Sequence, residues 1–172
     1  MSYYLPTKIV LGTLEREIKK EVDLFKPQRI LLVSSQSMRK TGLIEKLLDC
    51  LFGYQISVFG EVKPYPSPEM VKIAKQDSDL IIGLGGGSVL DVAKVVATEL
   101  KRPYIAIPTT AGTGSEVTPF AALYDLEKKK KLSLDVNFPD VALVDYKLTL
   151  TMPAELTAST GMDALSQAIE AY

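Results

Sequence analysis

Three glycines and a serine follow an apolar segment in the middle of the chain and precede a helical pattern. The loop consists of Gly85, Gly86, Gly87 and Ser88. Glycines let the backbone turn sharply and let a ligand approach the main chain closely. We expect Ser88 to cap the helix, with Asp91 three residues on completing a capping box. Exposed N–H groups and the positive end of the helix dipole then predict a phosphate or pyrophosphate site. A glycine-rich turn without a ligand is the alternative.

A second loop, residues 108–116, follows another apolar segment and is rich in hydroxyl groups. It carries two glycines and four hydroxyl side chains, on Thr109, Thr110, Thr113 and Ser115. Such side chains can form hydrogen bonds with a ribose, a phosphate or a carboxamide. A Ser/Thr-rich turn without a ligand is again the alternative. Two loops of this kind, each after a predicted buried strand, favour one shared binding site.

Short apolar runs rich in Val and Ile alternate with helical patterns, and these elements must position the loops. Buried strands are predicted at residues 30–33, 56–59, 80–84, 104–107 and 141–144. Helices are predicted at residues 14–25, 38–51, 69–76 and 89–100. Continuous apolar strands suit a parallel sheet that is covered on both faces. The alternation predicts an α/β, doubly wound, mainly parallel (Rossmann-like) sheet, which binds ligands at the carboxyl ends of its strands. A hairpin is predicted at residues 120–135, with its turn at 127–131.

The pattern changes near residue 150. We predict one α/β domain at residues 1–150 and the start of an all-helical second domain at residues 151–172. Pro153 suits a first helical turn, and Met162, Leu165 and Ile169 fall near helical spacing. The helical pattern reaches Tyr172 without a stop signal, which predicts that the second domain is truncated.

Composition excludes several classes of protein. The 172 residues carry a formal net charge of -1, so there is no basic excess that would indicate nucleic-acid binding. We expect a cytoplasmic protein without a secretory signal or an apolar run of the ~20 residues that cross a membrane. Cys50 is the only cysteine, which fits a reducing compartment. The chain has no histidine, so its chemistry must use carboxylates, hydroxyls, lysines, backbone amides or a cofactor.

Four segments together resemble the motifs of the iron-containing (group III) alcohol dehydrogenases. Residues 85–94 are similar to the family motif GGGSxxDxAK, in which Asp91 and Lys94 stand at the named positions. Residues 108–116 are similar to the loop PTTxGTGSE. Residues 144–153 and the segment TGMDAL at 160–165 follow in the family's order and spacing. The resemblance covers essentially the whole chain.

This resemblance implies a two-domain enzyme whose first domain binds NAD or NADP. Hydride would move between the nicotinamide and an alcohol, aldehyde or ketone carbon, while a divalent iron or zinc ion polarises the oxygen. Gly86, Gly87 and Ser88 would hold the pyrophosphate. Asp163 would be the first metal ligand. The other candidate cofactor-binding residues are Ser35, Gly85, Asp91, Thr109, Thr110, Thr113 and Lys131.

Two positions depart from the family's pattern. Gln167 stands where a ligand histidine is expected, one helical turn after Asp163, and its amide oxygen is a weaker ligand than imidazole. Ser35 stands where many NAD-preferring relatives have an aspartate that repels the 2′-phosphate of NADP. Ser35 removes that repulsion, with Arg39 nearby in the sequence, and favours NADP.

Other functions and assemblies remain open at this point. A glycerol dehydrogenase-like or dehydroquinate synthase-like enzyme shares the fold, although the GTGSE loop and the TGMDAL segment favour the alcohol dehydrogenases. A non-catalytic dinucleotide-binding module is the alternative from another class. We expect small alcohols or aldehydes as partners, and neither nucleic acid nor a membrane. An N-terminal strand around Tyr3, Tyr4 and residues 8–10 would lie at the sheet edge or pair across a homodimer.

Overall fold

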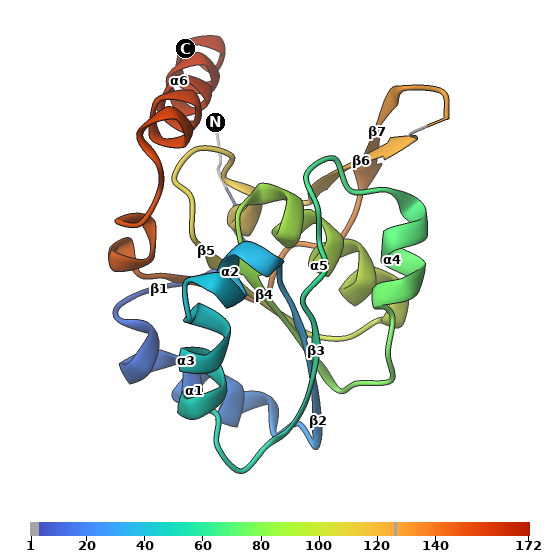
Figure 1. Cartoon of the computed structure of the whole chain (residues 1–172), viewed down its shortest axis with the longest axis vertical. Coiled ribbons are helices and arrows are strands. Elements are labelled where there is room, and N and C mark those ends of the chain that lie inside the picture. Colours follow the sequence, from blue (N-terminus) through green and yellow to red (C-terminus); the bar gives the residue numbers. More distant parts are fainter. Residues whose placement is uncertain (1–3, 126) are drawn as a thin grey trace.

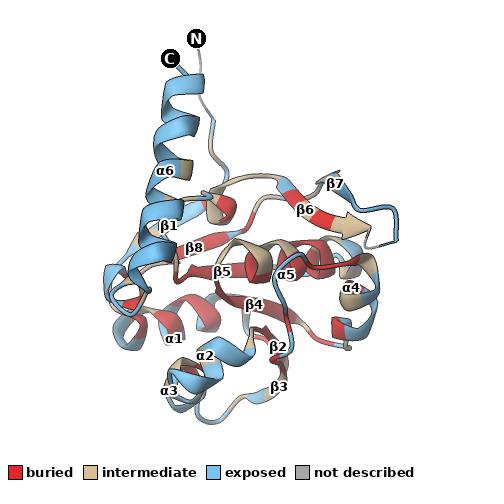
Figure 2. Ribbon diagram, turned by 45° about the horizontal axis from the view of Figure 1, so that its top comes forward, coloured by how far each residue is buried: buried red, intermediate tan, exposed pale blue. Residues whose placement is uncertain are grey.

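Six parallel strands form the central sheet of the computed structural model, which describes residues 4–125 and 127–172. Their spatial order is β1-β8-β5-β4-β2-β3 (Figures 1 and 2). The six strands are β1 (Lys8–Leu11), β2 (Arg29–Val33), β3 (Gln55–Phe59), β4 (Leu80–Gly85), β5 (Tyr104–Pro108) and β8 (Val141–Val144). All five predicted buried strands are present, and β1 adds an edge strand that pairs with β8 within the chain.

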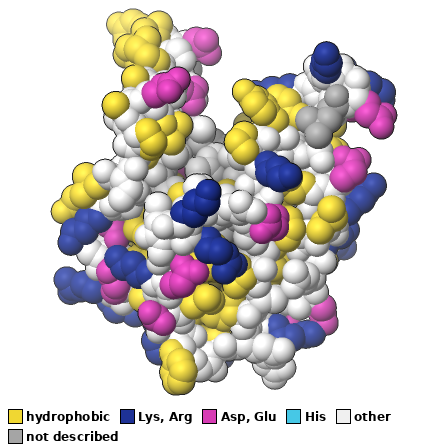
Figure 3. Space-filling view, viewed as in Figure 1, with side chains coloured by type: hydrophobic (Ala, Val, Ile, Leu, Met, Phe, Trp, Pro, Cys, Tyr) yellow, Lys and Arg dark blue, Asp and Glu magenta, His cyan; other side chains and the backbone are white. Residues whose placement is uncertain are grey.

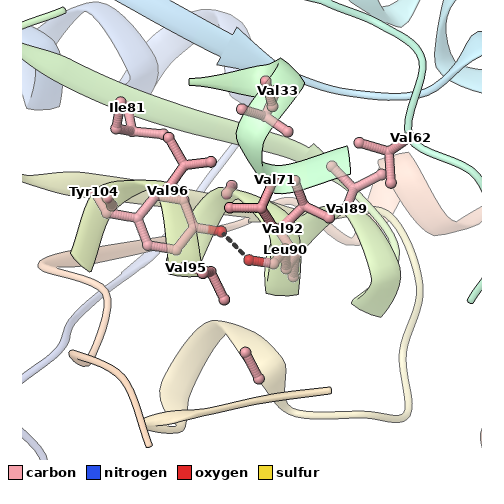
Figure 4. Close-up of a cluster of buried hydrophobic side chains, with 14 of the residues drawn as sticks. Val33, Val62, Val71, Ile81, Val89, Leu90, Val92, Val95, Val96 and Tyr104 are labelled. Atoms are coloured by element: carbon pink, nitrogen blue, oxygen red, sulfur yellow. Dashed lines mark hydrogen bonds between the residues drawn. The ribbon is translucent and has the colours of Figure 1, made fainter. Parts of the chain in front are cut away.

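Helices cover both faces of this sheet because alternate residues of each strand point to opposite sides. Ile82 belongs to the apolar cluster shared with α1 (Leu14–Phe25) and α3 (Leu43–Cys50). Ile81 belongs to the cluster shared with α4 (Pro68–Ala74) and α5 (Gly87–Leu100), part of which is drawn in Figure 4. The predicted doubly wound α/β architecture is therefore confirmed.

The winding changes direction between β2 and β4, which are hydrogen-bonded neighbours. The chain leaves β2 through α2 (Gln36–Lys40) and α3 toward β3 on one side. It leaves β4 through α5 toward β5 on the other side. Loops diverge at such a point, so a crevice forms beyond the carboxyl ends of the two strands.

The predicted helix at residues 38–51 is two helices. α2 ends at Lys40 and α3 begins at Leu43, with Gly42 between them at φ 74°. That left-handed conformation interrupts the helix and is readily adopted only by a residue without a Cβ. The leucine spacing predicts a continuous helix because its periodicity runs through Gly42.

An antiparallel hairpin lies apart from the main sheet, over α5. Its strands are β6 (Phe120–Asp125) and β7 (Lys130–Asp135). The predicted hairpin is confirmed, but its turn is shorter than predicted, because Lys130 and Lys131 already belong to β7. Contacts between α5 and β6 hold the hairpin on the outer side of that helix.

The last helix projects away from the sheet (Figure 2). After the 3-10 turn η2 (Tyr146–Thr149), α6 (Ala154–Glu170) runs as one helix, and none of its residues is buried. Apolar side chains gather on it in Figure 3; the most exposed are Met162, Leu165 and Ile169. Of the described helices, none is long and apolar enough to cross a membrane. At the other end of the chain, Tyr3 lies outside the described residues.

The Asp145 side chain connects the start of α1 to η2, and we predict that it stabilises the fold. The residue is 3% exposed, and its carboxylate accepts hydrogen bonds from the backbone N–H of Leu14 at 2.9 Å and of Lys147 at 3.0 Å. Asp145→Ala should lower the free energy of unfolding by about 1–3 kcal/mol, because the buried N–H of Leu14 at the start of α1 loses its acceptor. Urea denaturation measures the change. Asp49→Ala, an exposed aspartate of α3, is the control and should change stability by less than about 0.5 kcal/mol.

Candidate functional site

A cleft of about 630 Å³ lies at the carboxyl ends of the strands. The segments after β2, β3, β4, β5 and β8 all contribute to its lining, so it occupies the place where the winding changes direction. Seven of the candidate cofactor-binding residues line it: Ser35, Gly86, Gly87, Ser88, Thr109, Thr110 and Thr113. Met152, Leu156 and Thr160 form the wall on the side of α6. The two loops therefore meet at one cleft, as their order along the sequence indicated.

The glycine loop carries the start of α5 to the cleft. Gly86 occupies the N-cap position in an extended conformation, and its carbonyl accepts hydrogen bonds from the N–H groups of Val89 and Leu90. The N–H groups in a first helical turn have no partner within the helix, so this helix start offers donors to an anion.

The predicted cap at Ser88 is wrong. Ser88 is the second residue of α5, and no side chain caps this helix. A capping residue must have extended backbone, and here Gly86 has it. Ser88 instead lines the cleft.

The glycines also allow the two loops to touch. A Cβ on Gly86 would lie 3.1 Å from the Cγ2 of Thr110, and one on Gly87 would lie 2.9 Å from the Cγ2 of Thr113. Both distances are shorter than an ordinary contact between carbons. The absence of side chains at these positions therefore brings the threonine loop against the start of α5 and leaves the backbone accessible from the cleft.

The threonine loop is fixed at both of its ends. Thr109 is 3% exposed, and its N–H donates to the carbonyl of Gly85 at 3.0 Å. At the other end, the N–H of Ser115 donates to the hydroxyl of Thr113 at 3.3 Å. In between, a Cβ on Gly112 would lie 2.7 Å from the carbonyl oxygen of Thr160, so the loop also touches α6.

Asp91 faces away from the cleft, and the predicted capping box is wrong. Its carboxylate accepts from the hydroxyl of Ser115 at 2.7 Å and from the N–H of Ala122 in β6 at 3.0 Å. Lys94, one turn later, is 1% exposed, and burial lowers the pKa of its ammonium to about 8, against the opposite effect of the nearby Asp91 and Glu116. No sequence pattern indicated these contacts of Lys94, which stands in the sequence only as part of the GGGSxxDxAK-like motif.

The remaining candidate nucleotide contacts differ in position. The Ser35 hydroxyl lies 2.8 Å from that of Ser37 at the edge of the cleft, next to β2. Arg39 pairs at 3.8 Å with Glu45 and is not among the residues that line the cleft. Lys131 is exposed on β7, opposite Tyr124, and does not line the cleft. An acid near Ser35 that the sequence analysis missed is Glu61, whose carboxylate accepts from the Gln36 amide at 2.8 Å.

The two candidate metal ligands lie on α6 and bind each other. The Nε2 of Gln167 donates to Oδ1 of Asp163 at 2.9 Å. Among the described residues there is no group of three His, Cys, Asp or Glu side chains that could hold a metal ion. Enzymatic zinc sites generally use three protein ligands. Asp163 and Gln167 therefore do not by themselves fit a tightly held catalytic metal.

A family model for iron-containing alcohol dehydrogenases matches residues 6–146. The chain is 36% identical to a 1-propanol dehydrogenase from Citrobacter freundii, over 99% of this chain and 49% of the relative. It is 37% identical to an NADPH-dependent butanol dehydrogenase from Clostridium saccharobutylicum, over 100% of this chain and 52% of the relative. The chain thus spans about half the length of the curated relatives it matches.

Solved structures also match this chain over about half of their own length. A sulfoacetaldehyde reductase from Bifidobacterium kashiwanohense, in complex with NAD+, superposes with a TM-score of 0.91 and 34% identity. That alignment covers 99% of this chain and 53% of the reductase. An iron-containing alcohol dehydrogenase from Thermotoga maritima aligns with a TM-score of 0.88 and 36% identity, over 99% of this chain and 55% of the other.

Proposed function

The chain belongs to the iron-containing alcohol dehydrogenases, and from this membership we propose that it is the cofactor-binding part of an NAD(P)-dependent oxidoreductase. The whole enzyme would interconvert a small alcohol and an aldehyde or ketone. When bound, the cofactor supplies or accepts a hydride at its nicotinamide ring. One observation carries the proposal: the glycine loop and the threonine loop meet in a 630 Å³ cleft where the winding changes direction.

The residues of the cleft suit a dinucleotide in distinct ways. The first turn of α5 presents backbone N–H groups and the positive end of its dipole to the pyrophosphate. Gly86 and Gly87 leave room for that close approach, because they add no side chain. Thr110 and Thr113 offer hydroxyls to the sugars or the carboxamide. Apolar side chains such as Met38 and Val62 offer a surface for the adenine ring.

A titration with NADH and NADPH tests the proposal. We expect saturable binding of both, followed through the fluorescence of the reduced nicotinamide or by calorimetry. Metal analysis of the same sample gives its iron and zinc content. Absence of saturable binding of either dinucleotide by the folded 172-residue chain would contradict the proposal.

We further propose that NADPH binds at least as well as NADH, because Ser35 puts no charge at the edge of the cleft. Ser35→Asp should shift the ratio of the two dissociation constants by about tenfold, or ~1.4 kcal/mol, toward NADH, since a carboxylate there repels the 2′-phosphate. Ser133→Asp adds the same charge at an exposed position of β7 and should leave the ratio unchanged. A wild-type protein that strongly prefers NADH would contradict this proposal.

We also propose that residues 151–172 begin a second, helical domain, while residues 1–150 form the dinucleotide-binding domain. The exposed apolar side chains of α6 support this division. A cytoplasmic location and a homodimer stay as predictions. A binding module without turnover is the second candidate function, and it is favoured by the two-donor set of Asp163 and Gln167. Turnover assays, described below, separate the two functions.

A further inference from the structure

A buried polar cluster behind the cleft connects the glycine-loop helix to the threonine loop. Asp91 and Lys94 lie one turn apart on α5, and both contact Ser115 in η1 (Ser115–Val117). The hydroxyl of Ser115 donates to Oδ1 of Asp91 at 2.7 Å, and the Nζ of Lys94 donates to that same hydroxyl at 3.0 Å. Nζ also donates to the carbonyl of Phe120 at 2.8 Å. None of these three side chains lines the cleft.

Ser115 contacts both this cluster and Thr113, a residue that lines the cleft. Its side chain is held by α5, while its backbone N–H holds the hydroxyl of Thr113 at 3.3 Å. The methyl group of Thr113 in turn lies against Gly87 at the start of α5. Gly114, which lies between Thr113 and Ser115, has a φ of 62°, so the chain turns sharply at this point. The position of the cleft-lining Thr113 therefore depends on a serine that is anchored outside the cleft.

The charge in this cluster needs a reason beyond packing. Lys94 is 1% exposed, and an ammonium in such a place is costly unless it is paired and hydrogen-bonded. The titratable groups around it are Asp91 at 3.9 Å on its own helix, Glu116 in η1 and Tyr104 in β5. Burial raises the pKa of Tyr104 well above its ordinary value, so the phenol stays neutral and donates to the carbonyl of Leu90 (Figure 4).

We propose that Asp91 and Lys94 are positioning residues for the cofactor cleft: through Ser115 they hold Thr113 in place against the glycine loop, and they set the affinity for the dinucleotide without touching it. This inference rests on the proposed function for its ligand, but the coupling between the cluster and the loop exists without one. It replaces the sequence-based prediction that Asp91 contacts the cofactor.

Removing the anchor should weaken binding. We expect Ser115→Ala and Lys94→Met each to raise the dissociation constant for NADH by about tenfold, which is ~1.4 kcal/mol. Thr98→Val is the matched control. Thr98 lies at the far end of α5, where its hydroxyl accepts a hydrogen bond from the backbone N–H of Asn137. Thr98→Val should lower the stability to urea but leave the dissociation constant unchanged. An equal loss of affinity in Thr98→Val would overturn the proposal by showing a general effect of destabilisation.

A double-mutant cycle tests the route through Thr113. Thr113→Val removes the hydroxyl that accepts from Ser115, so adding Ser115→Ala to it should weaken NADH binding by less than twofold further. Full additivity of the two substitutions would overturn the route.

The pH dependence of NADH binding distinguishes a positioning role of Lys94 from a merely structural one. Because the pKa of Lys94 is about 8, its ammonium is mostly charged at pH 7 and mostly neutral at pH 9. The charged form donates a stronger hydrogen bond to the Ser115 hydroxyl, so NADH affinity should fall as pH rises through 8. The dissociation constant of Lys94→Met should not change over that range. A wild-type profile that matches that of Lys94→Met would overturn the proposal.

Hydrogen exchange of the cofactor-free protein separates this inference from the proposed function. Ser115→Ala should speed amide exchange in residues 109–118, whereas Thr98→Val should not. If exchange changes as expected but wild type binds neither NADH nor NADPH, the proposed function fails and the coupling stands. If wild type binds NADH but neither exchange nor affinity responds to Ser115→Ala, the inference fails and the proposed function stands.

Discussion

Replacing Gly86 with valine should lower the affinity for both NADH and NADPH by at least about tenfold, or ~1.4 kcal/mol. A Cβ at this position would lie 3.1 Å from the Cγ2 and 3.3 Å from the Oγ1 of Thr110. The threonine side chain can shift by a few tenths of an ångström, so we expect the protein to fold. The two methyl groups of valine would then occupy the space through which the pyrophosphate approaches the first turn of α5.

Titration of purified Gly86→Val with each reduced dinucleotide measures this effect, after urea denaturation has established that the variant is folded. Ala158→Val adds a branched side chain at an exposed position of α6, outside the lining of the cleft, and should bind as the wild type does. Unchanged affinity in folded Gly86→Val would remove the glycine loop from the binding site.

The second large effect concerns metal and turnover: the 172-residue chain should retain less than stoichiometric iron or zinc after dialysis and should not oxidise short alcohols. Asp163 and Gln167 supply two oxygen donors, and the amide is the weaker of them. Loss of most direct ligands should lower metal affinity by far more than the roughly 10–100-fold that follows from losing an outer hydrogen-bond partner. Hydride transfer also needs the substrate held against the nicotinamide in a cleft that excludes water.

Metal content by elemental analysis and NAD(P)-linked oxidation of short alcohols and diols check this expectation. Gln167→His is the informative variant, because an imidazole one turn after Asp163 provides a second strong ligand on the same helix face. It should raise the affinity for zinc but still not give turnover. Stoichiometric metal or sustained turnover in the wild-type chain would contradict the prediction and require ligands from a partner chain or from other carboxylates.

Burial on both faces explains why the sheet could be predicted so closely. In a parallel sheet covered by helices, each strand is a continuous apolar run, and β2, β4 and β8 begin and end within one residue of the prediction. The convergence of the two loops also followed from the sequence, because carboxyl ends of parallel strands share one edge of the sheet. The helix break at Gly42 was missed because one residue in the left-handed region outweighs the periodicity around it.

The errors at the site have a common physical cause. Ser88 and Asp91 match a capping box by their spacing, and spacing carries no information about contacts made from outside the helix. The actual partners of Asp91 are Ser115 and Ala122, 24 and 31 positions away. The burial of Lys94 depends likewise on Ser115 and Phe120, in a loop and a hairpin whose packing on α5 no local pattern reveals.

The placement of β1 beside β8 has a consequence for how the chain is made. Lys8 is in register with Val141, and the Leu14 amide finds its acceptor on Asp145, 131 positions further along. During synthesis the first strand would therefore leave the ribosome long before its partner exists. The neighbours β2, β3, β4 and β5 can assemble earlier, from segments that follow one another closely. Until β8 emerges, β1 would be an unpaired edge with exposed Ile9 and Leu11, the kind of segment that chaperones bind and that misassembles when translation stalls.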